Sequence, residues 1–483
     1  MNYVTKGLYP EKVFRNFENI SQIPRSSGKE KQVSDYIVNF AKDLGLDTYQ
    51  DEYNNIVIRK PATNGNPDGP TVMLQSHIDM VTESGDFSNH DFDKDPIELI
   101  IDGNHLHAND TTLGADNGIG VAYMMAILES QDIKHPNLEC VFTSDEEVGL
   151  IGVNRLDFSN LKSSLVINLD SEEDYNILVG CAGAVDSILS IRKEYKPATP
   201  TNVALEITIR GLFGGHSGMD IDKNRGNANQ IMGRLLNSIS VDFDIFNIDG
   251  GSKRNAIPRT SETVISVSDK DIEQAAKDIQ KMSAKIQKEL YATEPNLKIS
   301  LRRSASMDFK VFTDACKDKI IKTLMLMPAG VIAMEAELDE QVETSTNFAL
   351  VKETDTHIEF KNLTRSSSQS KKEYVKSKIE ALADLLGAEI EFSAGYPAWE
   401  YNSNSQLESK AVDIYKDVFK KAPNVLVMHC GLECGILLSK LPQKAEAISI
   451  GPTMYDVHTP KEHVEIDSVG KIWDYLLTLL ERI

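Results

Sequence analysis

Five short segments of the chain carry residue types that bind metal ions, namely SHIDM, LGADNG, SDEEVG, NLDSEE and DVHTP. Together they supply two imidazoles and three carboxylates, from His77, Asp116, Glu147, Asp170 and His458. Imidazole and carboxylate ligands suit zinc, and cobalt or manganese also accept them. Because these groups are numerous enough for two ions, the set predicts a site for two divalent metals.

The residues beside two of these ligands have types that fit supporting roles. Asp79 follows His77 by two residues, so on an extended strand its carboxylate can accept a hydrogen bond from the imidazole. Glu146 directly precedes Glu147, so one carboxylate can bind metal while the other faces a metal-bound water. An isolated Glu-Glu pair is ordinarily a solvated charge pair. Here the pair directly follows the apolar strand pattern LECVFTS, which favours a position at a strand edge.

Asp116 has two interpretations at the level of the residue pattern. It stands where a helical pattern begins, and an Asp at such a place commonly caps the helix. The alternative is a carboxylate that bridges two cations about 3.5–4 Å apart. The pattern leaves both interpretations open.

The segments with these residues lie in a pattern of strands that alternate with helices. A helical pattern covers residues 29–44, and another follows Asp116. Strand patterns occupy residues 55–59, 71–79, 138–144 and 165–170. Near-continuous apolar strands between amphipathic helices predict an α/β fold with a helix-covered, mostly parallel sheet. In such sheets ligands bind beyond the carboxyl ends of the strands, which is where the polar residues fall.

After about residue 186 the pattern changes to that of a second domain. Residues 204–215 and 262–269 alternate apolar and polar side chains, as half-buried antiparallel strands do, and a helical pattern follows each. Residues 357–394 repeat the strand, helix, strand order of residues 262–301, and an internal duplication is one interpretation. We therefore expect one domain at residues 1–186 and 395–483, with an inserted α+β domain at residues 187–394.

Length and composition are those of an ordinary folded protein. The 483 residues are about three times the ~150 expected of one domain, with 41% hydrophobic and 26% charged residues. The 73 Asp and Glu against 51 Lys and Arg give a net charge of -22, which repels nucleic acid and anionic membranes. The five cysteines suggest no disulfide framework, and the sequence shows neither a signal peptide nor an apolar membrane span. We therefore expect a cytoplasmic protein with neither nucleic acid nor membrane as a partner.

The motifs resemble those of a known enzyme family. Seven of them occur in that family's order and extend over nearly the whole chain: SHIDMV, TTLGADNGIGVA, TSDEEVGLIG, NLDSEE, GGHSGMDI, GGSKRNAIP and GPTMYDVHTPKEHV. On this basis the chain resembles the M20 family of cocatalytic zinc peptidases and, within it, the aminoacyl-histidine dipeptidases. Every expected ligand and base position holds the family's residue type.

The resemblance implies two zinc ions per chain, which cobalt or manganese could replace. His77 and Asp170 would bind one ion. Glu147 and His458 would bind the other, and Asp116 would bridge the two. The domain with these ligands would be catalytic, and the inserted domain would be a lid.

The resemblance also implies catalytic and substrate-binding residues. Glu146 would be the general base, and Asp79 would support the imidazole ligand that precedes it. His216, in the GGHSG turn, resembles a lid histidine that stabilises the tetrahedral intermediate, although its residue pattern alone favours an ordinary loop histidine. Asn255 and Arg365 are candidates for binding the substrate carboxylate.

Three functions are weighed against one another. The first is a metal-dependent dipeptidase that hydrolyses Xaa-His and other dipeptides, and the second is an amidohydrolase of N-acyl amino acids. The third is a non-catalytic metal or peptide binder, against which the presence of Glu146 argues. The resemblance leaves a homodimer open, because smaller lids in the family pair between subunits, whereas a duplicated lid would let one chain imitate the partner.

Overall fold

The chain forms two units in the structure, a computed structural model that describes residues 3–63, 65, 67–86, 88–304, 310–393 and 395–483. Unit 1 comprises Met1–Cys181, Tyr401–Met428 and Leu432–Ile483, and unit 2 comprises Ala182–Glu400 and His429–Gly431. The boundary expected after residue 186 falls inside unit 2, because strand β9 (Gly183–Arg192) begins before it. The boundary expected after residue 394 falls on a residue outside the described ranges.

Unit 1 is built on one large sheet. Its strands are β1 (Asp47–Gln50), β2 (Ile56–Lys60), β3 (Thr71–His77), β6 (Asn137–Thr143), β7 (Leu165–Asn168), β8 (Asn176–Cys181), β20 (Asn424–Met428) and β21 (Glu446–Ser449). They lie in the order β1-β2-β6-β3-β7-β21-β8-β20. The central neighbours β6, β3, β7 and β21 are parallel, whereas β1 and β2 join antiparallel. The predicted α/β class with a mostly parallel sheet is thereby confirmed.

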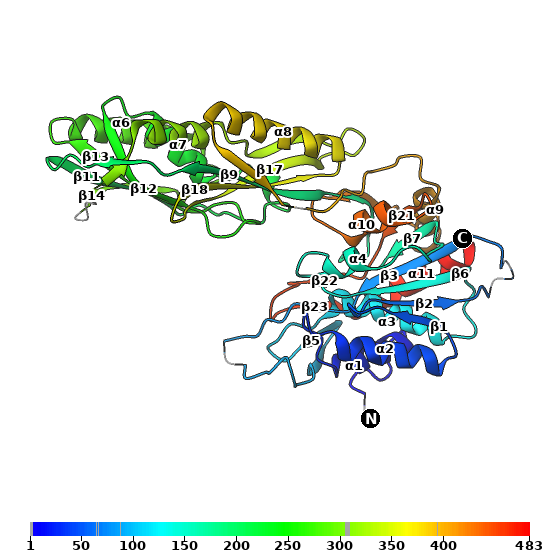
Figure 1. Ribbon diagram of the computed structural model, residues 1–483. Coiled ribbons are helices and arrows are strands. Elements are labelled where there is room, and N and C mark those ends of the chain that lie inside the picture. The colour runs from blue at the N-terminus through cyan, green and yellow to red at the C-terminus, as the bar shows by residue number, and fades with distance from the viewer. Residues whose placement is uncertain (1–2, 64, 66, 87, 305–309, 394) are drawn as a thin grey trace. The chain divides into compact units, whose positions relative to one another are not determined.

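Helices cover this sheet, which explains why its central strands are apolar along their whole length. The helices of unit 1 are α1 (Glu11–Ser21), α2 (Lys31–Asp43), α3 (Ala115–Glu129), α4 (Ile151–Arg155), α9 (Gln406–Phe419), α10 (Glu433–Lys440) and α11 (Ile466–Arg482). Figure 1 shows α1, α2 and α3 grouped on one side of the strands. All but the first residue of β3 and of β6 are buried. No helix within the described ranges combines the length and the apolar character needed to cross a membrane.

Unit 1 also contains a second, small sheet, which holds a loop with a predicted metal ligand. Its strands are β4 (Leu99–Asp102), β5 (His105–Ala108), β22 (Met454–Tyr455) and β23 (His463–Glu465), in the order β22-β23-β5-β4. The loop between β22 and β23 contains His458. This sheet therefore fixes both ends of a loop with a predicted metal ligand.

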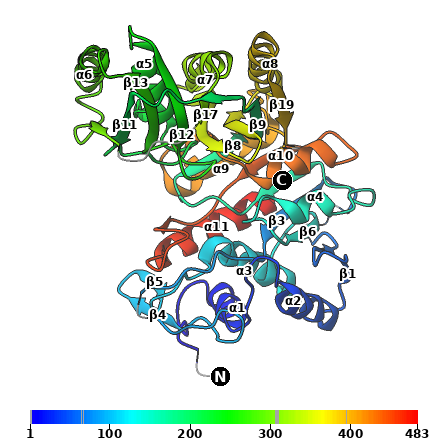
Figure 2. The same cartoon turned by 60° about the vertical axis from the view of Figure 1, so that its left-hand side comes forward.

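Unit 2 contains a nine-stranded antiparallel sheet, a separate two-stranded sheet and several helices. Besides β9, its strands are β10 (Tyr195–Pro197), β11 (Asn202–Arg210), β12 (Phe243–Gly250), β13 (Ser261–Ser268), β14 (Lys298–Arg303), β15 (Lys310–Phe312), β16 (Gly330–Met334), β17 (Val342–Glu353), β18 (His357–Ser366) and β19 (Glu389–Phe392). Its helices are α5 (Ala228–Asn237), α6 (Ile272–Glu289), α7 (Asp314–Leu326) and α8 (Gln369–Leu386), with a short 3-10 helix at Ile221–Lys223. Figure 2 shows the four helices along one face of the strands.

The two halves of this sheet have the same connectivity. The strand order is β14-β11-β13-β12-β17-β18-β9-β19, and β16 pairs with β17. At one edge, β14 pairs with β11 and β11 with β13, and α6 connects β13 to β14. At the other edge, β19 pairs with β9 and β9 with β18, and α8 connects β18 to β19. The units β13-α6-β14 and β18-α8-β19 are the two segments whose sequence patterns repeat.

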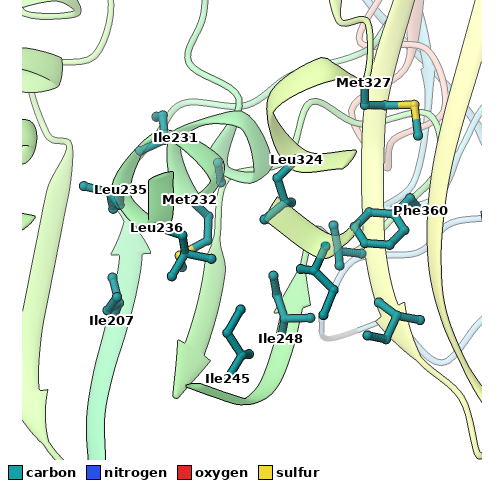
Figure 3. Close-up of a cluster of buried hydrophobic side chains, with 14 of the residues drawn as sticks. Ile207, Ile231, Met232, Leu235, Leu236, Ile245, Ile248, Leu324, Met327 and Phe360 are labelled. Atoms are coloured by element: carbon teal, nitrogen blue, oxygen red, sulfur yellow. The ribbon is translucent and has the colours of Figure 1, made fainter. Parts of the chain in front are cut away.

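The core of unit 2 lies between the sheet and its helices. On β11, Leu205, Ile207 and Ile209 are buried, and the residues between them are less so. Figure 3 shows Leu235 and Leu236 of α5 among side chains from β11, β12 and α7. One face of the sheet therefore supplies the core, as the alternating pattern predicts.

Candidate metal centre and active site

Three of the five predicted ligands lie at or just beyond the carboxyl ends of parallel strands, whereas Asp116 lies at the start of α3 and His458 in the loop between β22 and β23. His77 is the last residue of β3, and Asp170 follows the end of β7 by two residues. Glu146 and Glu147 come shortly after β6. Because these strands are parallel neighbours, their carboxyl ends meet at one edge of the sheet.

The five predicted ligands form two groups that share Asp116. Its Oδ1 lies 3.0 Å from His77 Nε2, which in turn is 3.5 Å from Asp170 Oδ1. Its Oδ2 lies 3.1 Å from His458 Nε2, which is 2.9 Å from Glu147 Oε1. Within each group the possible ligand atoms all lie within 4.8 Å of one another. One carboxylate thus directs a different oxygen to each group.

The contacts of Asp116 bear on its two interpretations. The residue has φ -79° and ψ 111°, non-helical angles that an N-cap residue also adopts, so the backbone alone does not separate a cap from a bridge. Its carboxylate oxygens lie 3.0 Å from His77 Nε2 and 3.1 Å from His458 Nε2. These two contacts favour the bridging carboxylate.

Asp79 supports more of the site than its spacing predicts. The side chain is fully buried, and its Oδ1 lies 3.3 Å from His77 Nδ1, as expected of a supporting carboxylate. It also accepts hydrogen bonds from the backbone N–H groups of Glu146 and Glu147, at 3.1 and 3.2 Å. Ser27 Oγ donates a further one at 2.8 Å. One carboxylate therefore orients an imidazole and holds the turn with the two glutamates.

The charges in the site favour bound cations. Burial raises the pKa of Glu146 well above its ordinary value, and the charges of Asp170 and Glu147 raise it further. Burial and neighbouring carboxylates also raise the pKa of Asp170, to about 7. For His458, burial lowers the pKa, but hydrogen bonds to Asp116 and Glu147 outweigh this and raise it to about 11. Carboxylates this crowded attract positive charge, and their combination with imidazole fits divalent metal ions.

Several buried polar side chains lie on or beside the strands that carry the ligands, and none of them is among the residues predicted from the sequence. Gln75 Nε2 donates to Glu433 and to Thr143 Oγ1, and Thr143 Oγ1 donates to Glu433 Oε2 at 2.7 Å. On the other side, Asn168 Nδ2 donates to Gln75 Oε1 at 2.7 Å, and Ser449 Oγ donates to Asn168 Oδ1 at 2.5 Å. Burial raises the pKa of Glu433 to about 8. The available signal was a Gln and an Asn inside otherwise apolar strands.

Unit 2 contains the other three predicted site residues, and the loops of two of them are bonded together. Ser217 donates its backbone N–H to the carbonyl of Asn255 at 2.9 Å, and His216 forms a β-bridge with Ala256. The Nδ1 of His216 accepts the backbone N–H groups of Gly218 and Met219, at 3.3 and 3.2 Å. Because Nδ1 is an acceptor, the neutral ring has its proton on Nε2.

Arg365 occupies β18 and is 6% exposed. Its Nη1 donates to the hydroxyl of Tyr396 at 3.2 Å. Burial lowers the pKa of His216, and the charge of Arg365 lowers it further. The same two causes lower the pKa of His429 to about 3, so unit 2 holds two neutral imidazoles near one guanidinium.

The chain is similar to peptidases along nearly its whole length. Residues 73–482 match the family described as peptidase family M20/M25/M40. The cytosol non-specific dipeptidase of Escherichia coli (strain K12) is 37% identical over 478 residues, which cover 99% of this chain and 98% of that protein. The crystal structure of aminoacylhistidine dipeptidase from Vibrio alginolyticus has a TM-score of 0.91 at 35% identity, covering 99% of this chain and 97% of that one. Aminopeptidase PepT from Bacillus cereus, at 15% identity and a TM-score of 0.57 over 98% of both chains, shares the fold.

Proposed function

Because the chain belongs to peptidase family M20/M25/M40, we propose that it is a dipeptidase that depends on two divalent metal ions. The observation that carries the proposal is Asp116, whose two oxygens are directed to two separate groups of imidazole and carboxylate ligands. The names of the relatives from Escherichia coli and Vibrio alginolyticus support dipeptides, Xaa-His among them, as the substrates.

The proposed ions are zinc, two per chain, with cobalt or manganese as alternatives that the same ligands accept. His77 and Asp170 would hold one ion, and Glu147 and His458 would hold the other. The carboxylate of Asp116 would be shared between the two groups. When bound, the ions lower the pKa of a water molecule and polarise the scissile carbonyl.

Glu146 is the proposed general base. It accepts a proton from the attacking water and returns it to the leaving amine. Asp79 positions this step, because it accepts the backbone N–H groups of Glu146 and Glu147 and contacts the imidazole of His77. Two ligands and the base thereby share one buried support.

Unit 2 is the proposed lid. His216 Nε2–H donates to the oxyanion that forms at the scissile carbonyl, and the backbone bonds at Nδ1 support this tautomer. Asn255 and Arg365 bind the carboxylate of the dipeptide, for which a guanidinium is suited by its paired donors. The matching halves of the sheet support the predicted duplication. A homodimer and a cytoplasmic location stay predictions.

The proposal is tested by assaying the purified protein on Ala-His, β-Ala-His and an N-acetyl amino acid, before and after chelation. We expect hydrolysis of the dipeptides, its loss on chelation and its return with zinc. Cleavage of the N-acetyl amino acid alone would show an amidohydrolase instead. Full activity after removal of the metal would overturn the metal-dependent mechanism.

A further inference from the structure

Glu462 is a buried carboxylate beside the proposed metal site that is not among its ligands. It is 2% exposed and accepts the backbone N–H groups of four consecutive residues. Oε2 accepts those of Leu113 and Gly114, at 2.8 and 3.0 Å, and Oε1 accepts those of Ala115 and Asp116, at 2.8 and 3.4 Å. The segment that ends in the shared carboxylate is therefore held along its length by one side chain.

Arg25 contacts the same segment through a backbone carbonyl group. It is 2% exposed, and its Nη2 donates to the carbonyl of Gly114. Its Nη1 donates to the carbonyls of Ile78 and Asp79, at 3.1 and 3.0 Å, directly after the ligand His77. Arg25 therefore joins the segment before Asp116 to the end of β3.

Gly114 lies where these two side chains meet. Its N–H bonds to Glu462 and its carbonyl to Arg25. It has φ +70°, and a Cβ there would lie 2.5 Å from Arg25 Nη2 and 2.8 Å from Met80 Sδ. The close approach of the guanidinium therefore requires glycine at this position.

The charged side chains of Arg25 and Glu462 are costly to bury, so their hydrogen bonds must replace the hydration that they lose. Burial lowers the pKa of Arg25 to about 10, although the charges of Glu462 and Asp79 raise it, so the guanidinium stays charged at neutral pH. A buried ion loses several kcal/mol of hydration unless good hydrogen bonds replace it. Arg25 and Glu462 together form seven hydrogen bonds with the backbone of two segments that contain predicted ligands.

We propose that Arg25 and Glu462 are positioning residues that fix Asp116 relative to His77 and His458 and so set the spacing of the two metal ions. Glu462 follows His458 by four residues, and Arg25 contacts the residues after His77, so the pair connects all three ligand-bearing segments. The inference rests on the proposed function and assigns a role to residues that touch neither metal nor substrate.

The test is the affinity of the chelated, metal-free protein for cobalt(II), measured by titration for wild type and Glu462→Gln. An amide retains one accepting oxygen, so two of the four N–H groups lose their acceptor. We expect Glu462→Gln to bind both ions still, but with an affinity for cobalt(II) about 10–100-fold lower than that of wild type, as for other residues that orient metal ligands. The kcat for Ala-His should fall with it, while KM stays within about twofold because no substrate contact changes.

Glu139→Gln is the matched control. Glu139 is also 2% exposed, and its carboxylate accepts the backbone N–H groups of Lys162 and Ser163, at 2.9 and 3.0 Å. It occupies the start of β6, at the opposite end from Glu146 and Glu147. Both substitutions should lower the thermal unfolding midpoint, but only Glu462→Gln should weaken cobalt binding.

Arg25→Lys provides a second variant, because lysine keeps the charge but lacks the fork that reaches three carbonyls. It should weaken cobalt binding at least about tenfold, whether or not Glu462→Gln folds. Wild-type affinity in either folded variant, or an equal loss in Glu139→Gln, would overturn the positioning role. A wild type that itself binds fewer than two ions would overturn the proposed function and this inference with it, whereas wild-type affinity in the variants would overturn the inference alone.

Discussion

Units 1 and 2 both place helices against a sheet, but they put their polar residues in different places. In unit 1 the central strands are buried along their length, and polar side chains collect where β3, β6 and β7 end. In unit 2, β11 alternates buried and more exposed residues, and its polar side chains Glu206 and Thr208 lie on the face of the sheet opposite the core. A parallel sheet thus brings residues from distant parts of the chain to one edge, whereas an antiparallel sheet spreads them over a surface.

Substitutions in the two units should therefore have different effects. The chemistry proposed for unit 1 depends on a few side chains at one edge of the sheet, so single changes there should alter metal binding or turnover. Most of unit 2 carries no proposed site residue, so changes there should alter stability, apart from the loops at His216 and Asn255 and the position of Arg365 on β18.

The largest expected effect is that of Glu146→Gln in unit 1. Removal of the proposed base should lower kcat on Ala-His about 10²–10⁴-fold, because proton transfer from the attacking water is lost. Metal content, measured on the same preparation, should stay at the wild-type value. A kcat equal to that of wild type would refute the role of Glu146.

Next in size is Leu235→Ala in unit 2. Leu235 is fully buried in the core of Figure 3, so truncation should cost about 2–5 kcal/mol of unfolding free energy, measured by urea denaturation. Zinc affinity of the folded protein should not change. The matched variant is Leu476→Ala in the core of unit 1, where the side chain is equally buried. If Leu235→Ala weakened zinc binding as strongly as the loss of a ligand, the separation of the two units would be wrong.

Glu433→Gln should change how stability depends on pH. Burial raises the pKa of Glu433 from its ordinary 4.5 to about 8, so folding favours the protonated form. The contribution of Glu433 to the unfolding free energy is therefore fully present below about pH 4.5 and is lost as the pH rises through about 8. The side chain of the glutamine variant cannot ionise. The unfolding free energy of metal-free wild type should therefore fall by at least about 1 kcal/mol relative to that of the variant as the pH rises over this range.

Urea unfolding of both metal-free proteins at about pH 5 and about pH 9 measures this difference. Parallel changes in the two proteins would contradict the assigned pKa of Glu433.

The smallest effect is expected on the surface of unit 2. Arg302 donates two hydrogen bonds to Glu206, both at 2.8 Å, but its side chain is 72% exposed. Arg302→Ala should therefore leave the unfolding free energy almost unchanged and kcat unchanged. A loss as large as that of Leu235→Ala would show that this face is not a solvated surface.

The sequence predicts the fold class and most of the ligand cluster because both depend on local patterns. Apolar runs give the buried strands, and the polar residues that end them, such as His77 and Asp170, fall at the edge where parallel strands place ligands. The residue pattern leaves Asp116 open to both interpretations, because a capping and a bridging carboxylate both suit the start of a helix, and only its tertiary contacts with His77 and His458 favour the bridge.

Arg25, Glu433 and Glu462 could not be found in this way. Each acts through contacts with segments far away in the sequence, such as Glu462 with Leu113, and none has a spacing that marks it. The segment His429–Gly431 is a similar case, because only tertiary contacts assign these three residues to unit 2. Local patterns thus identify groups that bind, and the folded chain is needed to identify groups that position them.

The central claim is that Asp116 joins two ligand groups that hold two ions. It is tested most directly by adding zinc to the metal-free protein while the hydrolysis of Ala-His is recorded. The account predicts that wild type needs two ions per chain for full activity and that Asp116→Ala stays inactive at the same zinc concentration. Full activity with one ion per chain or with none, or an Asp116→Ala variant as active as wild type, would contradict it.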